Sequence, residues 1–149
     1  MPPRKIYSAE LGLNLDSGRE EESFKWFLAC LLFGKPIQQD IARRAFHELT
    51  DSGITSPTAL LDTGWQGLVE ILDRAHYVRY DFSTASKLLD VAQGVNDKYG
   101  SFGDLLRQAG STKRLSGSLR ELKGVGPKTV DIFLRDMSPA LQKSWGYEC

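Results

Sequence analysis

Residues 23–33 constrain the fold of this chain more than any other segment, because they are apolar on every face of a helix. One face carries large apolar residues at the i, i+3, i+4 and i+7 spacing, namely Phe24, Phe27, Leu28, Leu31 and Leu32. The other faces are apolar as well and carry Trp26, Ala29, Cys30 and Phe33. A helix without a polar face must be surrounded by other elements, so the segment predicts a buried central helix, ended by Gly34 and Pro36.

The rest of the chain predicts a series of further helices. Apolar residues recur at helical spacing over 38–50, 57–61, 65–75, 83–99, 102–109, 118–122 and 127–137. No stretch alternates apolar and polar residues over a length that could seed a sheet. Residues 1–22 lack periodicity and predict an irregular or lightly docked N-terminal arm. The predicted fold class is therefore all-α, with a single domain over residues 23–149.

The composition narrows the classes of function. Lys plus Arg and Asp plus Glu both number 19, so the formal net charge is zero, which excludes a histone-like protein held on nucleic acid by bulk charge. Cys30 and Cys149 are too few for an iron–sulfur cluster or an all-cysteine zinc site, and no metal or cofactor is expected. No apolar run has transmembrane length, and the N-terminus lacks the apolar core of a signal peptide. We expect a monomer in the reducing cytoplasm, associated with the nucleoid if the source is prokaryotic.

The most specific local signal is the segment Leu-Lys-Gly-Val-Gly-Pro-Lys-Thr-Val at residues 122–130. Gly124 and Gly126 bracket Val125, and glycine permits both unusual backbone angles and close approach of a ligand to the main chain. Gly126 stands at the N-cap position of the next helix, and Pro127 fits the first helical position. The free N–H groups of that helix should therefore point at the hairpin and form an anion site.

The charges around this segment favour a phosphodiester as the anion. Lys123 and Lys128 flank the hairpin, and Thr129 follows in the first turn of the helix. From residue 107 onward the chain has eight Lys or Arg and four Asp or Glu, a net charge of +4 concentrated at this end. A glycine-rich connector with solvated lysines is the alternative interpretation.

Residues 122–130 resemble the helix–hairpin–helix of the endonuclease III superfamily of DNA glycosylases, which share a Gly-Val-Gly-x-Lys-Thr-Ala signature. The resemblance covers about residues 23–137 and implies a helical barrel-type domain with a helix–hairpin–helix at about 118–137. It implies base-excision repair of double-stranded DNA that contains a damaged base or an abasic site. The DNA-binding residues it implies are Lys123, Gly124, Val125, Gly126 and Thr129, with Gln38 and Gln39 filling the gap left by a flipped base. For the two glutamines, an ordinary helix start is an equally good interpretation.

The resemblance gives Lys128 the position of the catalytic lysine of the bifunctional members. Its amine would attack C1′ of the damaged nucleotide, expel the base and form a Schiff base that permits β-elimination. A simple phosphate contact is the alternative role. The catalytic aspartate of the family is missing, because the corresponding window holds Gly146, Tyr147 and Glu148. Asp131 could share the helical face of Lys128, but it does not match the position of the family's aspartate.

Three hypotheses of function follow. The first is a DNA glycosylase or abasic-site lyase that acts through Lys128. The second is a non-catalytic helix–hairpin–helix module that binds DNA without the aspartate, and the third is a helical protein-interaction domain. Tyr77, Tyr80 and Phe82 are candidates for lining a base pocket, with core packing as the alternative.

Overall fold

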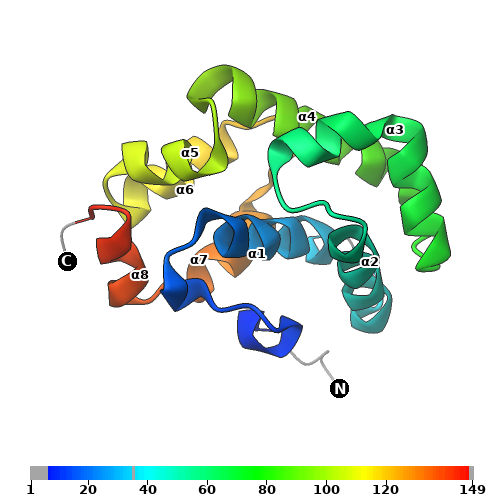
Figure 1. The fold of residues 1–149 in the computed structure, drawn as a ribbon, viewed down its shortest axis with the longest axis horizontal. Helices are drawn as coiled ribbons and strands as arrows, with labels where there is room; N and C mark the ends of the chain where they lie inside the picture. The colour runs from blue at the N-terminus through cyan, green and yellow to red at the C-terminus, as the bar shows by residue number, and fades with distance from the viewer. Residues whose placement is uncertain (1–6, 35, 148–149) are drawn as a thin grey trace.

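The computed structural model describes residues 7–34 and 36–147, and every regular element in these ranges is a helix (Figure 1). Two 3-10 helices come first, η1 (Ser8–Leu11) and η2 (Leu15–Ser17). The α-helices are α1 (Glu20–Phe33), α2 (Gln39–Asp51), α3 (Pro57–Arg74), α4 (Asp81–Tyr99), α5 (Phe102–Ala109), α6 (Thr112–Arg120), α7 (Pro127–Arg135) and α8 (Pro139–Ser144). The predicted all-α class is confirmed for this part of the chain.

The helices are arranged as a ring around α1. Each helix from α1 to α6 packs on the next one, and α7 packs on both α6 and α1. Figure 1 shows α1 in the middle, with α2 and α3 on one side and α5, α6 and α8 on the other. Helix α7 therefore closes the ring on the central helix.

The central position of α1 follows from its apolar surface, as the sequence predicts. All its residues from Trp26 to Leu32 are fully buried. The ring of Phe27 stacks on Phe102 at 5.0 Å and meets the edge of Phe133 at 5.4 Å. The indole N–H of Trp26 donates to the carbonyl of Phe133 at 3.1 Å, which joins α1 directly to α7.

Two side chains fix the C-terminal end of α1. The last carbonyls of a helix have no partner within the helix. Here the hydroxyl of Tyr77 donates to the carbonyl of Leu32 at 3.0 Å, and Nζ of Lys87 donates to the carbonyl of Leu31 at 2.8 Å. Burial raises the pKa of Tyr77 to about 12. Tyr77 is therefore a core residue, which decides against a role for it in a base pocket.

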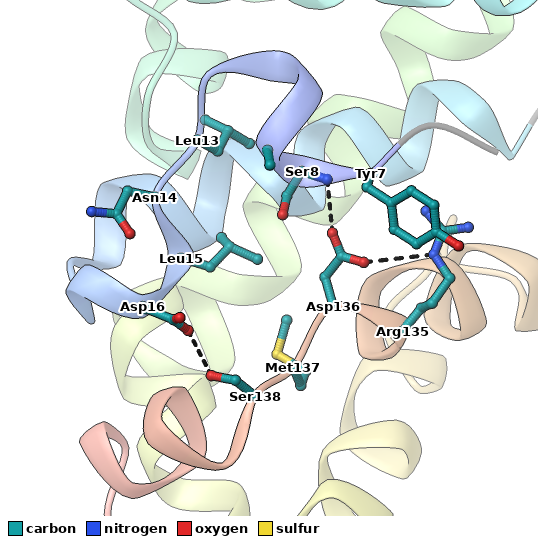
Figure 2. Close-up of a pocket in the computed structure, with 11 residues that line it drawn as sticks. Tyr7, Ser8, Leu13, Asn14, Leu15, Asp16, Arg135, Asp136, Met137 and Ser138 are labelled. Atoms are coloured by element: carbon teal, nitrogen blue, oxygen red, sulfur yellow. Dashed lines mark hydrogen bonds and ion pairs between the residues drawn. The ribbon is translucent and has the colours of Figure 1, made fainter.

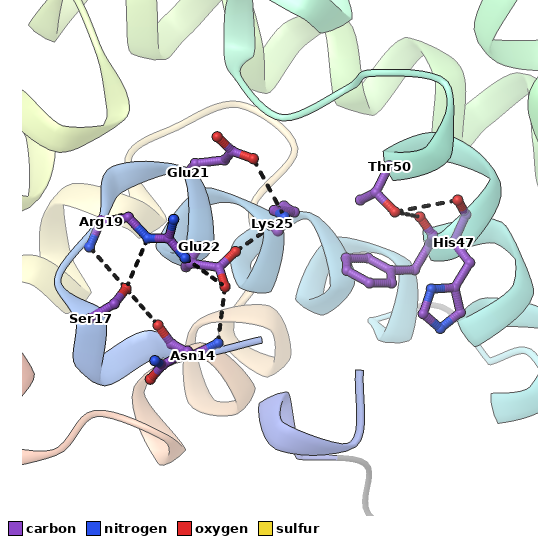
Figure 3. Close-up of polar contacts among 9 residues, drawn as sticks. Asn14, Ser17, Arg19, Glu21, Glu22, Lys25, His47 and Thr50 are labelled. Atoms are coloured by element: carbon purple, nitrogen blue, oxygen red, sulfur yellow. Dashed lines mark hydrogen bonds and ion pairs between the residues drawn. The ribbon is translucent and has the colours of Figure 1, made fainter. Parts of the chain in front are cut away.

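The N-terminal arm packs on the domain through buried leucines and a polar network. Leu11 and Leu15 are buried, and the main-chain N–H of Asn14 donates to Oε1 of Glu22 at 3.1 Å (Figure 3). Lys25 lies 3.1 Å from the other oxygen of Glu22. Burial alone would raise the pKa of Glu22, but the Asn14 hydrogen bond and Lys25 together lower it. The arm is thus docked, and residues 1–6 lie outside the described ranges.

Several predicted boundaries differ from the structure. The central helix starts at Glu20, before the predicted residue 23, so the end of the predicted arm belongs to α1. The predicted helices 57–61 and 65–75 are joined in α3, although Gly64 interrupts the helical geometry between them with φ 75° and ψ 170°. The largest error concerns α6, which starts at Thr112 rather than 118, because Ser111 caps it.

The end of the chain also differs from the prediction. The helix expected over 127–137 ends at Arg135, and α8 follows it without having been predicted. Ser138-Pro139 carries the same cap-and-proline signal as Ser56-Pro57 and could have identified α8. None of the described helices combines the length and the apolar character that crossing a bilayer requires.

Candidate functional site at the turn between α6 and α7

Residues 121–126 form the α6–α7 turn, and two buried apolar side chains hold it in place. Leu122 and Val125 are 6% and 8% exposed. Main-chain hydrogen bonds at 3.1 Å run from Leu122 to Leu119 and from Val125 to Leu122. Val125 therefore anchors the turn inside the domain.

Gly124 is required by the structure itself. Its φ is +98°, a backbone conformation that residues with a side chain rarely adopt. A Cβ at this position would lie 2.9 Å from Cγ of Lys87 and 3.3 Å from Cγ2 of Val91. Gly124 thus brings the turn into close contact with α4, next to the lysine that holds the end of α1.

Gly126 is different, because neither its conformation nor its packing requires glycine. Its φ of −96° and ψ of 171° are ordinary for any residue. A Cβ at this position would meet no heavy atom within 4 Å. The main chain in front of α7 is therefore open to a ligand.

The first turn of α7 has hydrogen-bond donors that no described residue uses. Gly126 offers no side-chain cap, and the first helical bond runs from Val130 N–H to the carbonyl of Gly126 at 3.3 Å. The N–H groups of Lys128 and Thr129 have no acceptor among the described residues. Elsewhere the chain caps four helices with serines whose Oγ accepts an N–H at 3.1 to 3.2 Å, namely Ser56, Ser101, Ser111 and Ser138.

The two predicted lysines lie on the surface beside these donors. Lys128 is exposed, and its side chain makes no ion pair or hydrogen bond with any other described residue. Lys123 has a side chain that is 83% exposed, and its Nζ lies 3.6 Å from Oδ2 of Asp90. An exposed pair at this distance is weak, so an anion could compete with Asp90 for Lys123.

The side chain of Thr129 is packed inside the domain rather than exposed at the site. The residue is 4% exposed, and a Cβ on Gly34 would lie only 2.7 Å from its Oγ1. The first turn of α7 is therefore packed against the end of α1. The sequence analysis assigns no role to Lys87, which contacts both the turn and α1. Its place beside the apolar stripe of α4 is the sequence signal that could have identified it.

The two predicted glutamines lie at the start of α2. Gln38 is the exposed N-cap residue, and its side chain makes no capping hydrogen bond. Gln39 is the first residue of the helix and is half-buried. Gly34, at the C-terminal end of α1, packs against Thr129, so the start of α7 lies at the end of α1 that precedes α2.

No carboxylate of the described residues forms an ion pair with Lys128. Asp131 is exposed one turn further along α7. Asp136 lies at the other end of α7, where it accepts the N–H of Ser8 at 2.7 Å and pairs with Arg135 at 3.6 Å (Figure 2). Tyr147 is buried and donates to the carbonyl of Leu106, and Glu148 lies outside the described ranges.

The described residues contain no group of three or more His, Cys, Asp or Glu that could hold a metal ion. Comparison of the chain with protein-family models, with curated proteins and with solved structures found no match in any of the three. The arguments for function therefore come from the α6–α7 turn: open main-chain donors at the start of a helix, with two exposed lysines beside them.

Proposed function

We propose that this chain binds the phosphate backbone of double-stranded DNA at the α6–α7 turn and acts in base-excision repair. In this proposal α6, the turn and α7 form a helix–hairpin–helix within a helical barrel-type domain similar to that of endonuclease III. The observation that carries the proposal is the open backbone at Gly126, in front of the unused N–H groups of Lys128 and Thr129.

A phosphodiester suits this site better than other anions for three reasons. Its oxygens can accept from two adjacent N–H groups, and the start of α7 has a partial positive charge. Lys123 within the turn and Lys128 just after it add full charges. A duplex offers phosphates in a regular row, which matches the net charge of +4 from residue 107 onward, made up of eight cationic and four acidic residues.

Fluorescence anisotropy with a labelled duplex at several salt concentrations tests the proposal. We expect binding to weaken with salt, and Gly126→Trp to abolish it by covering the N–H groups. Lys128→Ala should lower the slope of log K against log salt by about 1, as the loss of one phosphate contact does. Arg44→Ala is the matched control, because Arg44 is an exposed cation of α2 and does not belong to the cationic segment that starts at residue 107. Unchanged affinity of the Gly126→Trp variant would exclude the α6–α7 turn as the DNA site.

A second function, cleavage at abasic sites, is favoured by the position of Lys128. Its amine is exposed and without an ion pair among the described residues, so it can reach an aldehyde on bound DNA. The amine adds to C1′ of the ring-opened sugar and water leaves, which gives an imine. Loss of a C2′ proton then expels the 3′ phosphate by β-elimination. This reaction needs no base pocket, whereas glycosylase activity requires one as well as assistance in expelling the base.

Borohydride trapping separates the lyase from a module that only binds DNA. An abasic duplex and borohydride should yield a covalent adduct that Lys128→Ala removes and Lys123→Ala retains. Binding without any adduct would assign the chain to the non-catalytic class. The third hypothesis, a helical protein-interaction domain, predicts no salt-dependent duplex binding even at low ionic strength.

A further inference from the structure

A depression in the surface lies between α6, α7 and α8, away from the α6–α7 turn. It has a volume of about 480 Å³ and is lined by Thr112, Lys113, Ser116, Leu134, Met137 and Gln142. Leu134 is eight residues after Gly126, which places the depression about 12 Å along the helix axis from the open end of α7. We call it the α6–α8 pocket.

The residues of the α6–α8 pocket divide into an apolar and a polar part. Leu134 and Met137 are partly buried and pack against the core, so they present a small apolar surface. Thr112, Ser116 and Gln142 are half-buried, and Lys113 is exposed. No carboxylate lines the pocket, and every polar side chain in it can donate a hydrogen bond.

None of the four polar side chains uses its donors within the described part of the chain. No hydrogen bond or ion pair joins Thr112 Oγ1, Lys113, Ser116 Oγ or the amide of Gln142 to another described residue. The pocket beneath the N-terminal arm is different, because its polar groups satisfy one another: Ser8 with Asp136, and Asp16 with Ser138 at 2.6 Å (Figure 2). The α6–α8 pocket therefore has donors available for a ligand.

Helix α6, which supplies three of the lining residues, is cationic. Helix α6 contains Lys113, Arg114 and Arg120 and has no acidic residue. Phosphate oxygens can accept from an ammonium, two hydroxyls and an amide, which α6 and α8 contribute to the pocket lining. The adjacent Leu134 and Met137 can cover an apolar group on the same ligand, and the volume is in the range of small-molecule sites.

We propose that the α6–α8 pocket binds a phosphate ester whose phosphate lies at Lys113 and whose apolar body lies on Leu134 and Met137. This site is separate from the α6–α7 turn and does not depend on the proposed function. The phosphate can belong to a small phosphorylated molecule or to a DNA strand, since both present the same group to these donors.

Titration with phenyl phosphate, followed by NMR on the isotope-labelled chain, tests the site. We expect shifts at the backbone and side-chain signals of Thr112, Ser116 and Gln142 and at the methyl of Met137. Lys113→Gln should raise the dissociation constant about tenfold or more, as expected for loss of a charged hydrogen-bond partner. Arg114→Gln is the matched control, because Arg114 is an exposed cation of the same helix that does not line the pocket. Equal effects of the two variants, or shifts away from the pocket, would overturn the proposal.

A second arm of the experiment identifies the source of the phosphate. If a saturating short duplex prevents phenyl phosphate from binding, a DNA phosphate occupies the pocket; if it does not, the pocket serves a small ligand. In either case, phenyl phosphate alone must first produce the NMR shifts at the pocket residues. In the Gly126→Trp variant, phenyl phosphate should still bind at the α6–α8 pocket, so failure of DNA binding at the turn and failure of this site are distinguishable.

Discussion

Replacement of Gly126 by serine should make the protein more stable and a weaker DNA binder. The backbone at Gly126 already has the extended conformation of an N-cap residue, and a Cβ there would touch nothing within 4 Å. A serine Oγ could accept the N–H of Thr129, as the four serine caps of the chain accept the N–H three residues later. The same hydrogen bond would take a donor away from a bound phosphate.

The size of both effects can be worked out from this geometry. Serine is better than glycine at the N-cap by a few tenths of a kcal/mol. Loss of glycine's freedom in the unfolded chain adds about 0.4–1 kcal/mol at a compatible position. We therefore expect the free energy of unfolding to rise by about 0.7–1.3 kcal/mol. A hydrogen bond to a charged group contributes about 1.5–3 kcal/mol, so DNA affinity should fall at least about tenfold.

Urea unfolding followed by circular dichroism measures the stability, and anisotropy with a labelled duplex measures the affinity. Gly117→Ala is the control, because Gly117 lies within α6 and a Cβ added there would meet no heavy atom within 4 Å. It should stabilise the protein by a similar amount and leave DNA binding unchanged. A Gly126→Ser variant that is more stable and binds DNA as tightly as the parent would refute the claim that these N–H groups hold the phosphate.

Three further predictions concern the α6–α7 turn and the packing of α1 and α7. Gly124→Ala should lower the free energy of unfolding by about 2–3 kcal/mol in urea titrations, because φ is +98° and the new Cβ would lie 2.9 Å from Lys87; a change below about 0.5 kcal/mol would contradict this. Phe133→Ala should cost about 3–5 kcal/mol in the same assay, since its fully buried ring meets Phe27 and Phe102. Tyr77 has its pKa raised to about 12 by burial, so its contribution to stability is complete below the unfolded value near 10 and is lost as the pH rises toward 12. Urea titrations at pH values in this range measure the free energy of unfolding, which should fall less steeply with pH for Tyr77→Phe than for the parent protein.

The sequence predicts the part of the fold that depends on residue periodicity. The helix centred on residues 23–33 is identified correctly because its composition allows only a buried position, and Gly34 stands at its C-cap as expected. The break at Gly64 corresponds to the gap between two predicted helices. Packing of α7 against α1 was not predictable, because the contact between Gly34 and Thr129 joins residues far apart in sequence.

The errors come from helix-start signals that apolar periodicity does not reveal. Helix α6 is mostly polar, with only Leu115 and Leu119 buried, so its first turns carry no apolar pattern. Ser111 and Ser138 cap α6 and α8, and both serines are available as signals in the sequence. At the candidate site, the sequence identifies both Gly124 and Gly126. Only the structure shows that their roles differ: Gly124 is needed for the turn, and Gly126 leaves space in front of α7.

The position of Asp136 bears on the choice between the two proposed chemistries, expulsion of a damaged base and strand cleavage at an abasic site. Asp136 is the acidic residue near the end of α7, and its carboxylate is already used by Ser8 and Arg135. Helix α7 separates it from Lys128 by about 12 Å along the axis, since the two positions are eight residues apart. Asp136 therefore cannot assist Lys128 without release of the arm and a large movement. A Schiff base at an abasic aldehyde needs less assistance than expulsion of an intact base, so of the two chemistries considered, strand cleavage is the one that these described residues support better.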